Sequence, residues 1–109
     1  MAMGAVPEHH QLELAAEMLK ALADPSRLRL LLRLASGELN VSEIAELEQE
    51  KITTISARLK TLSTARLLKR RRVGQTILYS IADRHVLNLV DNVIEHAREP
   101  ANLNPMKGL

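Results

Sequence analysis

The chain has 109 residues, which is enough for one small folded domain and too few for two independent cores. No apolar run is long enough to cross a membrane, and the first residues lack the basic and apolar regions of a signal peptide. We therefore expect a cytoplasmic protein with no membrane partner. The absence of cysteine excludes disulfides, thiolate metal ligands and thiol redox chemistry.

The net charge of +2 conceals a separation of charge along the chain. Residues 1–50 carry four basic and nine acidic side chains, residues 51–82 carry eight basic and none acidic, and residues 83–109 carry three basic and four acidic. A basic block inside a folded chain is typical of proteins that bind nucleic acid, with a solvated basic face as the alternative. Tyr79 is the only aromatic residue, which argues against single-strand binding because that usually relies on aromatic stacking.

Two amphipathic helices are predicted at the start of the chain. Apolar residues at helical spacing indicate a first helix over residues 9–23. The stretch "ADPSRLRLLLRLASGE" indicates a second helix, because Asp24 can cap it, Pro25 suits its first position and Gly37 follows its end.

Two further helices are predicted in the middle of the chain. The stretch "NVSEIAELEQE" begins with Asn40, and Glu43 follows three residues later, an arrangement typical of a capping box. The next helix covers residues 52–65. Four apolar residues at helical spacing are expected to form its buried face: Ile52, Ile55, Leu59 and Leu62.

The pattern then changes from a helical to an extended one. In "RLLKRRRVGQTILYSI", Val73 and Gly74 separate a basic strand from a strand rich in β-forming residues, which predicts a hairpin. Asp83 follows in a position to cap a last helix, and Pro100 closes that helix.

The predicted fold is mainly α with a β-hairpin, in one domain over residues 1–109 whose ends, residues 1–8 and 100–109, are flexible tails. Two short successive helices followed by a basic hairpin are typical of a winged helix-turn-helix, in which the second helix, here residues 52–64, lies in the major groove of duplex DNA. Candidate contacts to bases and phosphates on its exposed face are Thr53, Thr54, Ser56, Arg58 and Lys60. The hairpin adds Lys69, Arg70, Arg71, Arg72 and Gln75 near the DNA backbone or minor groove.

Two segments carry a family resemblance that covers about residues 12–99. "KALADPSRLRLLLRLASGELNVSEIA" and "TISARLKTLSTARLLKRRRVGQTILYSIADRHV" resemble the ArsR/SmtB family of metal-sensing repressors. The resemblance implies a homodimeric winged-helix repressor that binds a two-fold symmetric DNA operator and releases it on binding its inducer. It implies neither an enzyme nor a small organic substrate.

The chain departs from the family pattern at two places. Many members carry two cysteines on the third helix, where "ELNVSEI" has Asn40 and Ser42. This argues against sensing of arsenic, cadmium, lead or copper(I) through thiolates. Arg66 stands where many members have a glycine suited to a left-handed helix end, so the local turn is expected to differ. Members that resemble the zinc-sensing branch also lack glycine here.

The last helix contains four possible metal ligands, Asp83, His85, His96 and Glu99. The two histidines are separated by roughly 16 Å along one helix, which is too far for one ion. If two copies of the helix lie antiparallel across a dimer, Asp83 and His85 of one chain meet His96 and Glu99 of the other, and symmetry gives two such sites. Two imidazoles and two carboxylates suit tetrahedral Zn²⁺, ahead of Co²⁺ and Ni²⁺. The spacing also resembles the last-helix site of the family's zinc sensors.

The resemblance further implies a relay in which the ring nitrogen of His96 that does not bind metal bonds the backbone carbonyl of Arg66. His9 and His10 are weaker candidates, interpreted first as part of a mobile tail or a cloning remnant. If they joined the site, they would raise the coordination number and favour Ni²⁺ or Co²⁺.

The residues leave two other functions open beside metal sensing. The first is a metal-independent winged-helix regulator whose histidines have no role. The second is a zinc hydrolase, which is disfavoured because all four ligand positions are filled by protein and no separate base lies near them.

Overall fold

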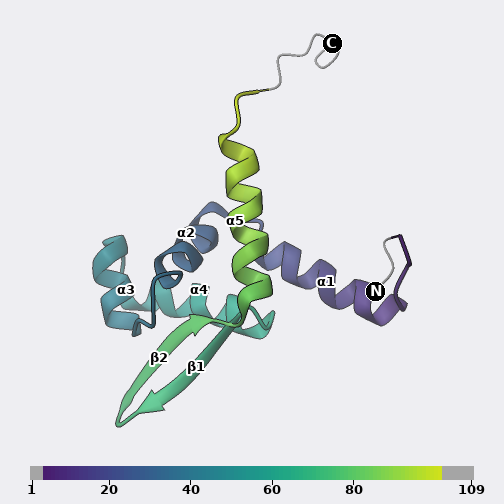
Figure 1. Cartoon of the computed structure of the whole chain (residues 1–109). Coiled ribbons are helices and arrows are strands. Elements are labelled where there is room, and N and C mark those ends of the chain that lie inside the picture. The colour runs from purple at the N-terminus through teal and green to yellow at the C-terminus, as the bar shows by residue number, and fades with distance from the viewer. Residues whose placement is uncertain (1–3, 102–109) are drawn as a thin grey trace.

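Four helices, a two-stranded hairpin and a fifth helix follow one another along the chain (Figure 1). The computed structural model describes residues 4–101, and the predicted tails fall partly outside this range and stay a prediction. The predicted order of elements and the winged helix-turn-helix are confirmed. The elements are α1 (His9–Leu22), α2 (Pro25–Leu34), α3 (Val41–Glu48), α4 (Ile52–Thr64), β1 (Leu68–Val73), β2 (Thr76–Ile81) and α5 (Arg84–Arg98). None of the helices in the described residues is long and apolar enough to cross a membrane.

The helix starts lie at the predicted capping residues. The Asp24 side chain accepts a hydrogen bond from the backbone N–H of Arg27 at 3.0 Å, with Pro25 at the first helical position of α2. Asn40 and Glu43 form the predicted capping box at the start of α3, with both bonds at 2.8 Å. These side chains satisfy amide groups that have no partner within the helix, and they therefore fix where α2 and α3 begin.

The core lies between α2, α3, α4 and the start of the hairpin. Ile55, Leu59 and Leu62 bury one face of α4, as predicted. They pack with a cluster whose other buried members are Ala21, Leu22, Leu30, Leu31, Leu34, Ile44, Ala45, Leu67, Leu68 and Val90. This packing holds α4 rigidly, so its opposite face has a defined direction.

The prediction that Ile52 belongs to this buried face is wrong. Ile52 is the first residue of α4, and its side chain is 50% exposed. The helical period gives the correct direction, but the first turn of α4 is not covered at this position by α2 or α3. The core contact of α4 therefore begins at Ile55.

The hairpin is regular, and its turn lies one residue later than predicted. Val73 is still part of β1 and pairs with Thr76, so the turn consists of Gly74 and Gln75. Gly74 has a φ of 64°, a left-handed conformation that glycine adopts at little cost. Tyr79 on β2 also exchanges two backbone hydrogen bonds with Leu39 at 2.9 and 3.1 Å, which attaches the hairpin to the connection between α2 and α3.

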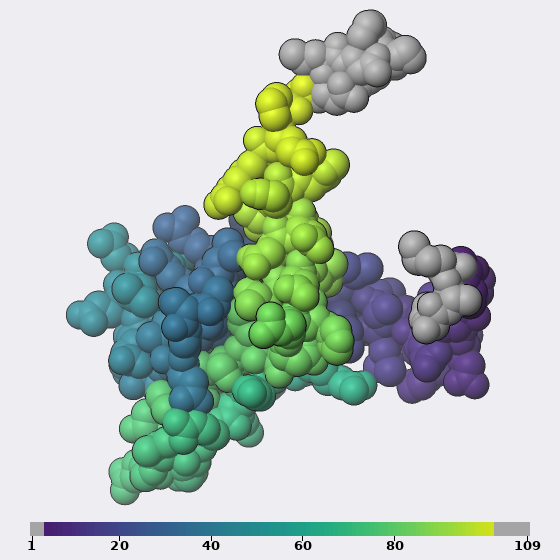
Figure 2. All heavy atoms as spheres, in the orientation of Figure 1, coloured from purple at the N-terminus to yellow at the C-terminus, as the bar shows by residue number. Residues whose placement is uncertain are grey.

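Helices α1 and α5 leave apolar side chains uncovered in a single chain. Val90 is the only residue of α5 that is buried. Leu89 and Val93 on α5 are 39% and 51% exposed, and Leu12 and Leu19 on α1 are 43% and 55% exposed. An apolar hollow lies between these two helices. In the space-filling view α5 rises above the helical layer and α1 extends away from it, so much of both surfaces is open (Figure 2).

Replacing Leu59 by alanine should weaken the fold far more than replacing Ile52. Leu59 is 2% exposed and its loss opens a cavity, so the free energy of unfolding should fall by about 2–5 kcal/mol. Ile52→Ala on the same helix should cost less than about 1 kcal/mol because the side chain is half exposed. Urea unfolding at one fixed protein concentration measures both. Equal losses would place Ile52 in the core.

Candidate nucleic-acid interface and metal ligands

The exposed face of α4 presents a short polar row. Thr53, Ser56 and Lys60 are spaced by three and four residues, so they share one face of the helix, and all three are exposed. Two hydroxyl groups and one ammonium group can bond to base edges and phosphates. The buried side chains of Ile55 and Leu59 fix the direction of this row.

Two of the predicted contacts lie beside the buried face instead. Thr54 and Arg58 are four residues apart and half-buried, so they lie together along one flank of the buried face. The Arg58 side chain is 21% exposed, and its Nη2 lies 3.7 Å from a carboxylate oxygen of Glu50 in the connection from α3. The expectation that Thr54 and Arg58 belong to the exposed face is therefore wrong.

A groove between α4 and the hairpin joins the polar row to the wing. Side chains alternate along β1, so Arg70 and Arg72 share one face of the hairpin. Arg70 lines a hollow together with Ser56, Lys60 and Tyr79. A second hollow shares Ser56 and Tyr79 and extends to Gln75 in the turn. The predicted residues Ser56, Lys60, Arg70 and Gln75 are thus brought to one continuous surface.

Tyr79 is a residue of this surface that the sequence did not single out. It pairs directly with Arg70 across the hairpin, so the two side chains lie on the same face. The alternation of β2 could have placed it there once the register was known. Ser63 and Thr64 at the end of α4 line the same hollow.

Lys69 and Arg71 lie on the other face of the hairpin. Arg71 donates two hydrogen bonds to the carboxylate of Glu38, from Nε at 2.7 Å and from Nη2 at 2.8 Å. The hydrogen bond from Arg71 lowers the pKa of Glu38, with a further contribution from the charge of Lys69, and Glu38 in turn raises the pKa of Arg71. The structure therefore does not bring Arg71 to the groove beside α4, and sequence reasoning missed Glu38 because the contact is not local.

Each end of α5 carries a histidine next to a carboxylate. At the start, Asp83 caps the helix by accepting a hydrogen bond from the Val86 N–H at 3.1 Å, and its Oδ1 lies 3.6 Å from Nδ1 of His85. At the end, Nδ1 of His96 lies 3.2 Å from an oxygen of Glu99. The side chains of His85 and His96 are 96% and 85% exposed.

One chain does not bring the two pairs together. Within residues 4–101 there is no cluster of three or more His, Asp and Glu side chains that could hold a metal ion. The pairs lie at opposite ends of α5, which stands upright in Figure 1. Each pair offers one imidazole nitrogen and one carboxylate, the donor types that Zn²⁺ accepts, and solvent reaches both. A site made of all four predicted ligands would therefore need a second chain.

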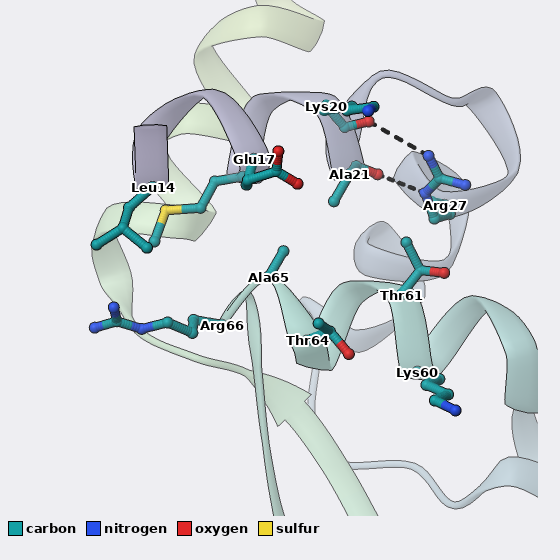
Figure 3. A pocket seen from close by; sticks show the side chains of 11 residues that line it. Leu14, Glu17, Lys20, Ala21, Arg27, Lys60, Thr61, Thr64, Ala65 and Arg66 are labelled. Carbon is teal, nitrogen blue, oxygen red and sulfur yellow. Dashed lines mark hydrogen bonds between the residues drawn. The ribbon is translucent and has the colours of Figure 1, made fainter. Parts of the chain in front are cut away.

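Arg66 lies just beyond the end of α4 and adopts the left-handed conformation that glycine would favour. Its φ is 65°, so the expectation that the turn would differ from the family's is wrong. Its side chain reaches a groove of about 500 Å³ between α1 and the end of α4, with Leu14 and Glu17 on the α1 side (Figure 3). In the described residues of one chain no hydrogen bond joins Arg66 to His96, so the relay stays a prediction.

His9 and His10 form the first turn of α1 and are not part of a mobile tail, which corrects that interpretation. Nε2 of His9 lies 3.7 Å from a carboxylate oxygen of Glu13, one turn along the helix. Nothing in the described part of one chain brings either histidine into a cluster with the α5 pairs.

Comparisons with known proteins identify the family. A family model described as a helix-turn-helix domain matches residues 22–71. A protein named transcriptional repressor SmtB homolog, from Synechocystis, is 45% identical over 89 residues, which cover 82% of this chain and 67% of the relative. The cadmium resistance transcriptional regulatory protein CadC homolog of Staphylococcus aureus is 34% identical over 89 residues. The matched region covers 81% of this chain and 74% of the relative.

The chain belongs to the ArsR/SmtB family. Among solved structures it is similar to a homodimeric winged helix-turn-helix DNA-binding domain from Mycobacterium bovis, described as a possible ArsR-family transcriptional regulator. That match has a TM-score of 0.82 and 35% identity and covers 94% of each chain. As a member of the ArsR/SmtB family the protein is a transcriptional regulator and not an enzyme.

Replacing Asp83 by alanine should destabilise this ArsR/SmtB protein, whereas replacing it by asparagine should not. Asparagine caps a helix as well as aspartate does, and alanine does not. The hydrogen bond from Val86 lowers the pKa of Asp83 below its ordinary value of 3.8, with the charge of His85 adding to it. The ionised Asp83 carboxylate therefore stabilises the fold at pH values above 3.8, and this stabilisation is lost as the pH falls through the lowered pKa of Asp83.

Thermal unfolding with a chelator present, at about pH 7 and about pH 3, measures this effect. Asp83→Asn should keep the wild-type midpoint at pH 7 and lose part of its pH dependence. A midpoint for Asp83→Asn as low as that of Asp83→Ala would show that charge, and not capping, stabilises the helix start.

Proposed function

We propose that the protein is a transcriptional repressor that binds operator DNA as a metal-free homodimer and releases it when Zn²⁺ binds. The observation that carries this proposal is the pair of exposed histidine–carboxylate groups at the two ends of α5. The ligands would be Asp83 and His85 from one chain, and His96 and Glu99 from the other. A regulator of this kind acts in the cytoplasm.

The uncovered apolar sides of α1 and α5 support the dimer. Leu19, Leu89 and Val93 are each more than one third exposed and surround an apolar hollow, which a second copy would cover. The similar Mycobacterium bovis domain is described as homodimeric. Antiparallel packing of two α5 helices would bring the start of each beside the end of the other and complete two equivalent sites.

The chemistry of the four ligands supports zinc. Two imidazole nitrogens and two carboxylate oxygens form a donor set suited to tetrahedral Zn²⁺, and Co²⁺ and Ni²⁺ accept the same donors. The chain has no cysteine, so soft thiolate coordination has no ligands here. The Staphylococcus aureus relative is named for cadmium resistance, which supports a response to a metal without identifying the metal of this protein.

The groove beside α4 supports binding of duplex DNA. Thr53, Ser56 and Lys60 would face the major groove, and Arg70, Arg72 and Gln75 would contact the DNA backbone. Two copies related by a two-fold axis would read two half-sites of a symmetric operator, so the spacing of the two α4 helices decides whether both fit.

Metal binding would act on that spacing. Two sites that tie the α5 helices together select one arrangement of the dimer, and coupling of this kind is typically about 1–3 kcal/mol and reciprocal. Arg66 lies at the end of α4, and its carbonyl would accept a hydrogen bond from His96 across the interface. This contact would transmit metal binding to the recognition helix.

Zinc should weaken operator binding by at least about tenfold in the wild type. Fluorescence anisotropy with DNA from the region upstream of the protein's own gene measures this, with and without stoichiometric Zn²⁺. His85→Ala/His96→Ala should bind the DNA equally well in both conditions. If the wild type also binds equally well, the protein is a metal-independent regulator.

Mixing two single variants tests whether the site is shared between chains. Neither His85→Ala nor His96→Ala alone forms an intact site, but a heterodimer of the two has one intact site and one without histidine. The mixture should therefore regain tight Zn²⁺ binding, at about one ion per heterodimer. If the mixture binds zinc no better than either variant alone, the four ligands are not shared in this way.

A further inference from the structure

Two N–H donors of the Arg71 guanidinium group are already bound to a carboxylate of the protein. These two hydrogen bonds to Glu38 are the paired arrangement in which arginine and carboxylate bind most strongly. Arg71 belongs to the basic strand β1, where a free arginine would be an obvious phosphate contact. Three N–H donors of the guanidinium group remain, but a phosphate could take the paired Nε and Nη2 donors only by displacing both of these bonds.

The backbone around Glu38 holds its carboxylate in place. The next residue, Leu39, is bonded to Tyr79 of β2 through both its N–H and its carbonyl. Asn40 after it is fixed as the cap of α3. The backbone contacts therefore hold Glu38 beside the hairpin without help from the ion pair. Forming the pair costs little additional backbone entropy.

Arg71 differs from Arg70 and Arg72 in the hairpin face on which its side chain lies and in the charged groups around it. Arg71 and Lys69 lie on the hairpin face that meets Glu38, whereas Arg70 lies in the groove beside α4. The hydrogen bond from Arg71 lowers the pKa of Glu38, and the charge of Lys69 adds to this. Displaced from Arg71, that carboxylate would stand unpaired next to the negatively charged DNA.

We propose that Glu38 withholds Arg71 from DNA, so that Arg71 positions the hairpin while Arg70 and Arg72 supply the phosphate contacts. The inference rests on the DNA binding proposed above, and it assigns to Glu38 the role of limiting the affinity for DNA. Glu38 thereby lowers the affinity for DNA of any sequence, since phosphate contacts do not depend on base identity.

The salt dependence of DNA binding counts the phosphate contacts. The logarithm of the affinity falls with the logarithm of salt concentration, with a slope of about −0.9 for each phosphate neutralised. We would measure this slope by anisotropy, with chelator present and the upstream duplex as probe, for the wild type and four variants. These are Arg71→Gln, Arg72→Gln, Glu38→Ala and Glu38→Ala/Arg71→Gln.

Arg72→Gln is the matched control and should make the slope shallower by about 0.9, because it removes one phosphate contact. Arg71→Gln leaves the Glu38 carboxylate unpaired near the DNA, so the contribution of Arg71 is judged from the double variant, which lacks both charges. Glu38→Ala should steepen the slope by about 0.9 and tighten binding, because Arg71 is then free to reach a phosphate. The double variant should return to the wild-type slope.

The outcomes separate this inference from the proposed function. If the double variant Glu38→Ala/Arg71→Gln flattens the slope as much as Arg72→Gln does, Arg71 contacts phosphate in the wild type and the inference is wrong. A slope unchanged in Glu38→Ala would also contradict it. If the wild type shows no salt-dependent binding at all, the proposed DNA binding fails as well. Thermal unfolding without DNA verifies that each variant is folded.

Discussion

The packing of α4 on α2 and α3 is the constraint on which the DNA-facing surface depends. Ile55, Leu59 and Leu62 are almost completely buried, so the helix cannot rotate about its axis without exposing them. Their burial fixes the direction of Thr53 and Ser56 on the opposite side. Leu67 and Leu68 continue the same core into the hairpin, which places the wing relative to α4.

Helix α5, unlike α4, buries little of its surface within its own chain. It fully buries only Val90 in its own chain, and the histidine–carboxylate pairs at its two ends are exposed. A helix with so little burial depends on a partner for most of its stabilisation. The DNA-reading part of the protein is therefore complete in one chain, whereas the proposed metal-binding part is completed by a second chain. Under the proposed mechanism, the interface between the chains can change without disturbing the core.

Local signals in the sequence predicted most of the fold. The capping pattern of Asn40 and Glu43 and the cap at Asp83 predicted helix starts correctly, because both the cap and the amide it satisfies lie within four residues. Helical periodicity correctly gave the direction of the core face of α4. It could not show where the neighbouring helices stop covering that face, which is why Ile52 was misplaced.

Contacts between distant residues could not be predicted in the same way. Arg58 with Glu50, and Arg71 with Glu38 thirty-three positions earlier, depend on how the elements pack. Composition identified the basic segment correctly but could not show which of its cations are already paired. For the metal ligands, the spacing along one helix predicted that no single chain could gather all four, and the separation of the two pairs agrees with this.

The exposure of the proposed ligands bears on how such regulators diverge. His85, His96 and Glu99 lie outside the core, so selection can exchange them for other donors without weakening the fold. Asp83 is different because it also caps α5, and only residues that cap well are acceptable there. The proposed metal preference could therefore be changed at three positions, whereas the fourth is constrained because it also caps α5.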